Sequence, residues 1–400
     1  MAQKKKAPQR KKKNILPFAA AGGVILIVAL VLTLILWPKA PDVPAAPAGE
    51  EFLFSAGLVP AKQDGLWGYM DISGKFTILP VYQAACVFSE NRLAAVLKDG
   101  KWGYINESGT VVIDCVYEDT TGFSHGLAPV QSNGRWGYIN ESGMNVIPSI
   151  YEYAGDFSVN GIAMVKNGGS YGFIKQDGTP LTQLQFQSAG NFGEQGLALV
   201  CLNGMYGYIN ESGSYAIEPQ FEAMGAFGAN GLAPAKNAQG WGFVDTAGNF
   251  VIAPQFDHAD AFSADGIARI RVSGKYGYIR SSGEYIAETT FQNAYPFCEG
   301  YALVVLDNRY GILKADGSYA KEPGSNVLSG VVKQGRLVFQ GENKLYGYID
   351  TAGNTIAQPQ FTEAKSFRKD GYALVQIDGK WGVISTDGTI IIQPQFEDIG

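Results

Sequence analysis

Short apolar runs alternate with glycine-containing turns along most of the chain, and this pattern returns about every 35 residues. In one unit, Leu93 to Lys98 and Lys101 to Asn106 flank Asp99-Gly100, and Thr110 to Asp114 follows the turn Glu107-Ser108-Gly109. Asp-Gly between two β-prone runs is a strong hairpin signal, because both central positions of a type I′ turn need positive φ. The pattern predicts an all-β fold in which each unit is a three-stranded antiparallel meander. The third strand should end near a proline, which cannot donate to a ladder.

An aromatic residue followed by glycine marks the same phase in ten tandem units, at spacings of 34 to 36 residues. We interpret these pairs as the structural signature of the repeat; they are Trp67-Gly68, Trp102-Gly103, Trp136-Gly137, Tyr171-Gly172, Tyr206-Gly207, Trp241-Gly242, Tyr276-Gly277, Tyr310-Gly311, Tyr346-Gly347 and Trp381-Gly382. Side chains alternate along a strand, so Trp102 and Tyr104 point to one face and Ile105 to the other. Both faces are apolar, which predicts that each small sheet packs between its neighbours. The glycine should let a neighbouring backbone or ring approach closely.

The segments Lys101-Trp102-Gly103-Tyr104-Ile105 and Lys380-Trp381-Gly382-Val383-Ile384, with Pro394-Gln395-Phe396, resemble the WG-repeat (KWG-repeat) family of bacterial β-repeat proteins. The resemblance spans residues 54 to 400. It implies a β-rich repeat domain, often secreted or membrane-anchored, with no catalytic residues to carry over. The eighth unit departs from the pattern, because Ser325 and Val331 stand where the phase would place aromatic residues. We expect a local distortion there.

Repeated small sheets either close into a propeller-like ring or continue as an open, spiral array. Closed propellers usually have four to eight blades of four strands, whereas this chain offers ten units that read as three-stranded. We therefore favour the open array over the ring.

The N-terminal region has a different pattern. Residues 1–14 form a basic tail with seven Lys and Arg and no acid, and residues 15–37 form an uncharged apolar segment. At 1.5 Å per residue this segment would be about 34 Å long, enough to cross a bilayer. The charge bias predicts a single transmembrane helix with the N-terminus inside. A cleavable signal peptide is the alternative, but the segment exceeds the usual apolar length.

Residues 38–50 read as a Pro/Ala-rich linker, and residues 51–400 as the repeat domain. Without the basic tail the chain carries 24 basic and 37 acidic residues, a net charge of −13, which argues against nucleic acid as a partner. We expect a plasma-membrane protein with one span and an extracytoplasmic C-terminal domain. The apolar fraction of 46% excludes disorder for most of the chain.

Few residues suggest chemistry. A Ser-His-Asp site needs one base held by one acid, and His258 with Asp257 or Asp260 is one candidate arrangement, but we expect His258 and His125 to be loop residues. The cysteines, Cys86, Cys115, Cys201 and Cys298, fall at four phases of the repeat; we expect small buried side chains, with a Cys86–Cys115 disulfide as the alternative. The acids recur at turns and after the third strand, where solvated roles are expected; they include Glu118, Asp119, Glu222, Asp257 and Asp398. No catalytic residue, metal site or cofactor is predicted.

These patterns favour a non-catalytic interaction platform that binds a protein or a cell-wall polymer. A glycan-binding lectin is the first alternative and would require a row of exposed aromatic side chains. A propeller-type hydrolase is the second, and it would require two carboxylates within about 10 Å of each other in one pocket. Ligand-binding residues are not assigned; loops near Glu152, Asn191, His258 and Lys365 are the positions that vary between units.

Overall fold

The computed structural model describes residues 52–193, 195–324 and 327–400. The basic tail 1–14, the membrane helix 15–37 and the linker 38–50 that the sequence predicts lie outside these residues, as does Glu51. In the described part of the chain, no helix has the length and apolarity that a membrane span requires. All its regular elements are β-strands, β1 to β39.

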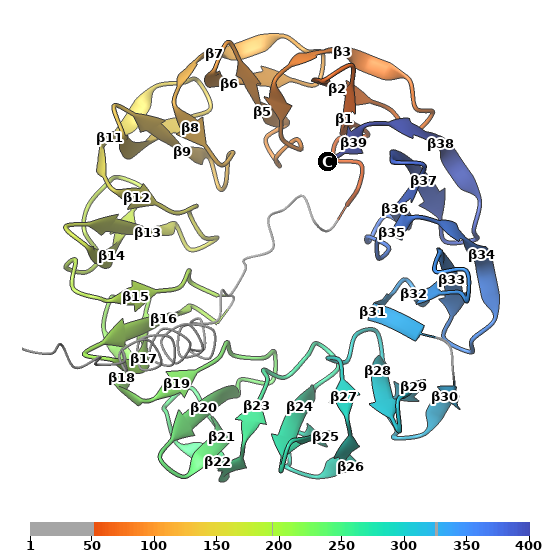
Figure 1. Cartoon of the computed structure of the whole chain (residues 1–400). Helices are drawn as coiled ribbons and strands as arrows, with labels where there is room; N and C mark the ends of the chain where they lie inside the picture. Colours follow the sequence, from red (N-terminus) through yellow and green to blue (C-terminus); the bar gives the residue numbers. More distant parts are fainter. Residues whose placement is uncertain (1–51, 194, 325–326) are drawn as a thin grey trace, which may run out of the picture. The chain divides into compact units, whose positions relative to one another are not determined.

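The strands form ten small antiparallel sheets, which we call blades 1 to 10 after the ten aromatic-glycine pairs they carry. Nine blades have four strands and blade 4 has three. Each full blade has an inner strand, two central strands joined by a hairpin, and an outer strand at the rim of the ring (Figure 1).

The inner strand has two residues in every blade except blade 9, where it has seven. From blade 1 to blade 10 the inner strands are β39 (Asp398–Ile399), β4 (Ala84–Ala85), β8 (Asp119–Thr120), β12 (Tyr153–Ala154), β15 (Ser188–Ala189), β19 (Ala223–Met224), β23 (His258–Ala259), β27 (Asn293–Ala294), β31 (Val327–Lys333) and β35 (Glu363–Ala364). The first central strands are β1 (Val59–Gln63), β5 (Leu93–Lys98), β9 (Leu127–Ser132), β13 (Ile162–Asn167), β16 (Leu197–Leu202), β20 (Ala233–Asn237), β24 (Ile267–Val272), β28 (Tyr301–Leu306), β32 (Arg336–Gln340) and β36 (Tyr372–Ile377).

The second central strands carry the aromatic-glycine pairs: β2 (Leu66–Met70), β6 (Lys101–Asn106), β10 (Arg135–Asn140), β14 (Ser170–Lys175), β17 (Met205–Asn210), β21 (Gly240–Val244), β25 (Lys275–Arg280), β29 (Arg309–Lys314), β33 (Tyr346–Asp350) and β37 (Lys380–Ser385). The outer strands are β3 (Phe76–Tyr82), β7 (Val111–Tyr117), β11 (Asn145–Tyr151), β18 (Tyr215–Phe221), β22 (Phe250–Phe256), β26 (Tyr285–Phe291), β30 (Tyr319–Gly324), β34 (Thr355–Phe361) and β38 (Ile390–Phe396).

The ring is closed by the C-terminus, so our preference for an open array is wrong. β39 supplies the inner strand of blade 1, with Ala61 opposite Ile399 and Lys62 opposite Asp398. The amide of Gly400 donates to the carbonyl of Pro60 at 3.0 Å. Blade 1 has no inner strand of its own, and the strand that follows blade 10 takes that place.

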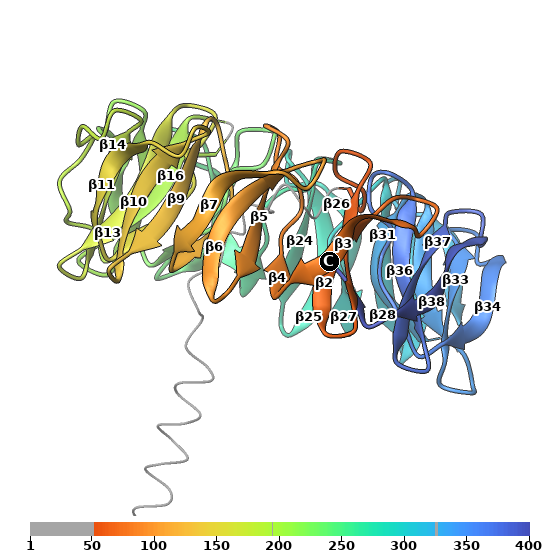
Figure 2. The same ribbon diagram turned by 90° about the horizontal axis from the view of Figure 1, so that it is seen from above.

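The hydrophobic core is divided into clusters that each draw on two neighbouring blades. Tyr69 and Ile78 of blade 1 pack with Phe88 and Val96 at the start of blade 2. The same arrangement continues across the closure, where residues of blade 1 pack with Leu374, Val383 and Ile392 of blade 10. The expectation that each sheet is sandwiched between neighbours is confirmed. Figure 2 shows this stacking for β5 to β7 and β9 to β11.

The central hairpin of blade 2 has the predicted bounds. The outer strand, β7, runs to Tyr117 and is longer than the predicted Thr110 to Asp114. In blade 6, β22 runs from Phe250 to Phe256 through Pro254 instead of ending near it. The outer strand is the last of its sheet, so a proline there need not break the ladder to its inner neighbour. The two-residue inner strand was also missed, because a strand this short has no periodicity of its own.

Two places depart from the regular blade. In blade 4, the segment from Pro180 to Phe186 replaces the outer strand and touches β14 through two isolated bridges. Around the eighth unit, where the sequence predicts a distortion, β30 ends at Gly324 and the next inner strand, β31, has seven residues instead of two.

Candidate binding surface

The glycine of each aromatic-glycine pair lies against the backbone of the outer strand. A Cβ on Gly103 would stand 2.6 Å from the carbonyl oxygen of Ile113 and 2.7 Å from the amide nitrogen of Cys115. The register between β6 and β7 shifts here, which marks a bulge in the ladder opposite the glycine. The close approach expected at this glycine is therefore present, and the neighbour is backbone.

The aromatic residue before the glycine is only half-buried, and the fully enclosed ring lies two residues later. Trp136 packs at the edge of a cluster in which Tyr138 is 0% exposed. The hydroxyl of Tyr138 donates to the carbonyl of Gly155, at the start of the next blade, at 2.7 Å. Burial raises the pKa of this hydroxyl, so it remains a donor.

This hydroxyl contact recurs between blades and was missed in the sequence. Tyr69, Tyr208, Tyr278 and Tyr348 make the same bond to carbonyls 17 residues ahead. Tyrosine directly after the glycine of the pair, in place of another apolar residue, was the signal that could have shown it. Four blades have no hydroxyl here, because blades 4, 6, 8 and 10 carry Phe173, Phe243, Ile312 and Val383.

The outer strands of blades 1 to 3 expose aliphatic side chains at the rim. Val81, Val116 and Ile150 occupy the same position, one residue before the closing tyrosine of β3, β7 and β11, and are 48%, 58% and 52% exposed. Further exposed aliphatic side chains lie on the same strands or directly before one of them; they are Leu79, Val111, Val112, Val146 and, one residue before β11, Met144. We call this set of eight residues the apolar rim.

At the position before the closing aromatic residue, most of the other outer strands are polar. Gln220, Gln255, Gln360 and Gln395 replace the aliphatic residue before the closing aromatic residue in blades 5, 6, 9 and 10. Exposed aliphatic side chains occur there singly, as Val251 of β22 and Ile391 of β38. Contiguous exposed apolar surface is uncommon and typical of an interaction site, whereas scattered single residues are ordinary.

A cavity of about 480 Å³ lies beside the apolar rim, where blade 4 lacks a regular outer strand. It is lined mainly by apolar side chains, including Tyr151 of blade 3 and Phe173, Pro180, Leu181 and Leu184 of blade 4. Leu184 is 40% exposed. The irregular segment thus extends the apolar surface from blade 3 to blade 4.

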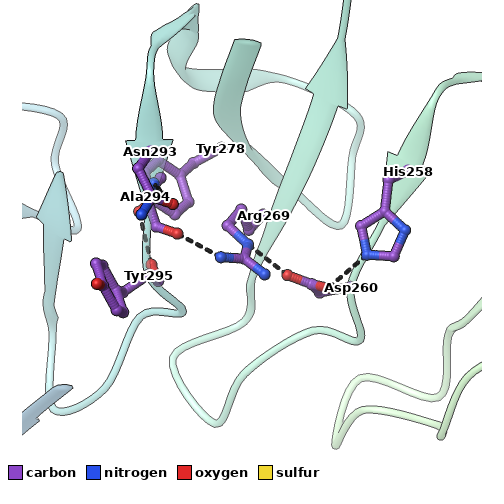
Figure 3. A network of polar contacts seen from close by, with 7 residues as sticks. All are labelled: His258, Asp260, Arg269, Tyr278, Asn293, Ala294 and Tyr295. Carbon is purple, nitrogen blue, oxygen red and sulfur yellow. Dashed lines mark hydrogen bonds and ion pairs between the residues drawn. The ribbon is translucent and has the colours of Figure 1, made fainter. Parts of the chain in front are cut away.

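A polar network links blades 7 and 8 on a different part of the ring (Figure 3). Asp260 accepts hydrogen bonds from Arg269 Nε at 2.5 Å and lies 2.9 Å from Nε2 of His258. Arg269 Nη1 donates to the carbonyl of Ala294 in β27, and Tyr278 donates to the adjacent carbonyl of Tyr295. Burial acts to raise the pKa of Asp260, but hydrogen bonds from His258 and Arg269 outweigh it and hold this pKa below its usual range.

The network brings together His258 and Asp260, one of the two acids that the sequence suggested. Its contacts join neighbouring strands and blades, which indicates a structural role. Asp257 instead accepts from the amide of Gly274 at 3.4 Å. The His258 and Trp241 rings meet in a T-shaped arrangement, with 5.4 Å between their centroids. Within residues 52–193, 195–324 and 327–400 no serine or cysteine is bonded to His258, so a Ser-His-Asp arrangement is not formed around this histidine.

Sequence comparison identifies the repeat. The family model described as "WG containing repeat" matches residues 67–102, 102–136, 136–171, 171–206, 206–239, 241–276, 276–310, 346–381 and 381–400. This chain belongs to the WG-repeat family. The stretch that the matches skip, between residues 310 and 346, contains the irregular strands β30 and β31, so the departure of the eighth WG repeat is visible in sequence and structure alike.

Three solved structures are distantly similar to the WG-repeat ring. A crystal structure of the eukaryotic initiation factor shares 11% identity, covers 75% of this chain and 94% of that chain, and has a TM-score of 0.48. The computationally designed Ika8 protein shares 12% identity over 68% of this chain and 96% of that one, with a TM-score of 0.35. AztD from Citrobacter koseri shares 9% identity over 76% and 95%, with a TM-score of 0.30. No curated protein matches the chain. These similarities say nothing about what the WG-repeat ring binds.

The acids that recur after the outer strand of a WG repeat hold turns. Glu118 accepts from the amide of Gly134 in the hairpin of blade 3 at 2.7 Å, and Glu152 and Glu397 do the same for Gly168 and Gly65. Asp119 and Asp398 each accept from the next amide along the chain, and Glu222 forms an ion pair with Lys236 at 2.9 Å. These contacts account for the recurrence of acids at this phase.

The remaining candidate residues are dispersed around the ring. His125 lies in an exposed loop, with Nδ1 3.0 Å from the carbonyl oxygen of Phe157. Lys365 lies over the Trp381 ring at 5.3 Å, and Asn191 lies exposed between blades 4 and 5. All four cysteines are free thiols, so the alternative Cys86–Cys115 disulfide is not formed.

A hydrolase of the predicted kind requires two carboxylates in one pocket, and one groove of the ring contains two. Asp177 and Glu211 both line a hollow of about 430 Å³ between blades 4 and 5, together with Asn160 and Lys175. A hydrogen bond from the Thr179 hydroxyl, at 2.6 Å, lowers the pKa of Asp177. A general acid in glycoside cleavage needs a raised pKa, whereas the pKa of Asp177 is shifted in the opposite direction. No cluster of three metal-ligating side chains occurs in the residues that the structure describes.

Proposed function

We propose that this WG-repeat protein is a non-catalytic binding platform, anchored in the plasma membrane by residues 15–37, whose extracytoplasmic ring holds a protein partner. The observation that carries the proposal is the apolar rim. Eight aliphatic side chains are exposed on or directly beside three adjacent outer strands, and three of them, Val81, Val116 and Ile150, stand where blades 5, 6, 9 and 10 place Gln. Burial of such side chains against a partner stabilises a complex by about 25 cal/mol per Å² of apolar surface.

A protein partner fits the rim better than a glycan does. Sugar rings are bound by stacking on exposed aromatic faces, and the apolar rim contains only Val, Leu, Ile and Met. Among the described residues, the exposed aromatic side chains are Phe52, Tyr153 and Tyr285, which lie in different blades or before blade 1. The lectin alternative therefore has less support from the surface.

Site-specific photo-crosslinking in the native host tests the platform. A photoreactive amino acid at Val116 or Ile150 should give a discrete adduct with another protein. The same amino acid at Gln220 or Gln395, the matched positions of blades 5 and 10, should give none. Equal adducts at all four positions, or no adduct at any, would contradict the proposal.

The membrane topology has its own test. A reporter that is active only outside the cytoplasm, fused after Gly400, should be active. The fusion should also remain in the membrane fraction after washing with high salt. A cytoplasmic reporter signal would overturn the predicted orientation, and release of the domain would favour the cleaved signal peptide.

A further inference from the structure

β7 of blade 2 is the least protected outer strand of the ring. Natural edge strands are shielded from pairing with other chains by proline, charge or bulges. Of the nine outer strands, only β7 and β26 contain no proline, and β26 carries Glu288, Thr289 and Thr290 instead. β7 reads Val-Val-Ile-Asp-Cys-Val-Tyr and carries one charge, Asp114. The bulge opposite the glycine is common to all nine outer strands and so does not distinguish β7.

The free edge of β7 has what a strand-adding ligand needs. The sheet order is β4-β5-β6-β7, so the outward backbone groups of β7 have no strand partner. Val112, Asp114 and Val116 alternate with the inward-facing Ile113 and are all exposed, with Val112 and Val116 at 43% and 58%. When a peptide adds to a sheet edge, backbone hydrogen bonds supply affinity and alternate side chains supply specificity.

Charge selects the kind of segment. The described domain is acidic, with 23 basic and 34 acidic residues from Phe52 onward, a net charge of −11. A Lys or Arg opposite Asp114 would be attracted by both the local and the overall charge, since opposite charges across a strand pair stabilise it and like charges destabilise it. Self-pairing of β7 centred on Asp114 would place two carboxylates opposite each other, which disfavours a second copy of this chain.

We propose that an extended segment of a partner protein, apolar at alternate positions and carrying a Lys or Arg, adds to the outer edge of β7 as a fifth strand of blade 2. The inference rests on the proposed binding function and names its ligand. The neighbouring side chains of the apolar rim, Leu79 and Val81 on β3 and Ile150 on β11, flank this edge and extend the contact beyond the single strand.

Fluorescence anisotropy with a defined peptide tests the proposal. The probe is a labelled nine-residue peptide of alternating Val and Thr with Lys at its centre, titrated with the full chain in lipid nanodiscs. We expect saturable binding, at least 10-fold weaker for the same peptide with Glu in place of Lys. Absence of binding at about 1 mM protein, or equal binding of both peptides, would overturn the proposal.

Three variants locate the site. V116Q installs the residue that blades 5, 6, 9 and 10 carry at this position, so the fold should tolerate it, and binding should fall at least 10-fold. V251Q makes the same change at an exposed valine of β22 and should leave binding unchanged. D114K should reverse the preference from the Lys peptide to the Glu peptide. Loss of binding in V251Q equal to that in V116Q would contradict the assignment to β7.

Two further results separate this inference from the platform itself. A photo-crosslink at Val116 to a partner, combined with failure of the peptide to bind, would retain the binding platform and overturn strand addition. Self-association in sedimentation that V116Q abolishes would assign the edge to a second copy of the chain, and would equally overturn the proposal.

Discussion

The outer strands of blades 2 and 10, β7 and β38, bury an isoleucine at the same place, Ile113 and Ile392, each no more than 6% exposed. Each also lies against the glycine of its own WG pair. At the exposed position before the closing aromatic residue, however, β7 carries Val116 and β38 carries Gln395. The comparison teaches that the inward positions of these two strands are kept for packing, while their outward positions are free to differ.

Of the changes proposed here, adding a side chain at the WG glycine should destabilise the packing common to the blades most strongly. Gly103→Ala and Gly382→Ala place a Cβ against the backbone of the outer strand, which cannot move as the end of a side chain can. We expect each to lower the free energy of unfolding by about 3 kcal/mol, through overpacking. Urea unfolding followed by tryptophan fluorescence measures it.

Gly100→Ala in the exposed hairpin turn is the matched control. Its Cβ would meet no atom within 4 Å, but the residue has φ of 74°, so a cost of about 1 kcal/mol is expected from the backbone alone. If Gly103→Ala costs no more than Gly100→Ala, the close approach does not explain the conserved phase of this glycine around the ring.

A smaller effect should follow from removing one hydroxyl contact between blades. Tyr138→Phe leaves the buried carbonyl of Gly155 without its donor, and we expect a loss of about 1–2 kcal/mol in thermal or urea unfolding. Tyr285→Phe, at a tyrosine of the rim that is 38% exposed, should change stability by less than about 0.5 kcal/mol. Equal effects at the two sites would show that the hydroxyl contact adds nothing.

The network of blade 7 should contribute a pH-dependent part of the stability. The pKa of Asp260 in the folded chain lies below its ordinary value of 3.8, so its ionised form stabilises the fold above about pH 4. This stabilisation is lost as the pH falls through the lower folded pKa. Asp260→Asn should cost about 1 kcal/mol at pH 7 and flatten the loss of melting temperature below pH 4. An unchanged acid profile would assign the pH dependence to other carboxylates.

Changes confined to the apolar rim should affect stability least. Val116→Gln exposes a polar group where an apolar one was already exposed, so we expect less than about 0.5 kcal/mol in urea unfolding. The same variant should lose the crosslinked or peptide ligand. A large loss of stability would mean that Val116 belongs to the core of blade 2, which would remove the contrast between the two kinds of position.

The sequence predicted the regular part of this structure well, because ten repeats average out local noise. The hairpin Leu93 to Asn106 and the packing of both sheet faces followed from turn chemistry and side-chain alternation. The closed ring did not, because closure depends on β39, a strand of two residues with no pattern of its own. The apolar rim was also missed, because Val116 and Gln395 share one repeat phase and only the structure shows that this phase faces outward.

The comparison of blades 2 and 10 rests on the claim that the ten WG repeats form one closed ring. A chain with its native cysteines replaced by alanine, and with Lys62→Cys and Asp398→Cys, tests this claim directly, because these residues are register partners across the closure. Mild oxidation should give an intramolecular disulfide in nearly all of the monomer, seen as a faster band on non-reducing gels. A chain that stays reduced, or that forms only intermolecular disulfides, would contradict the closed ring.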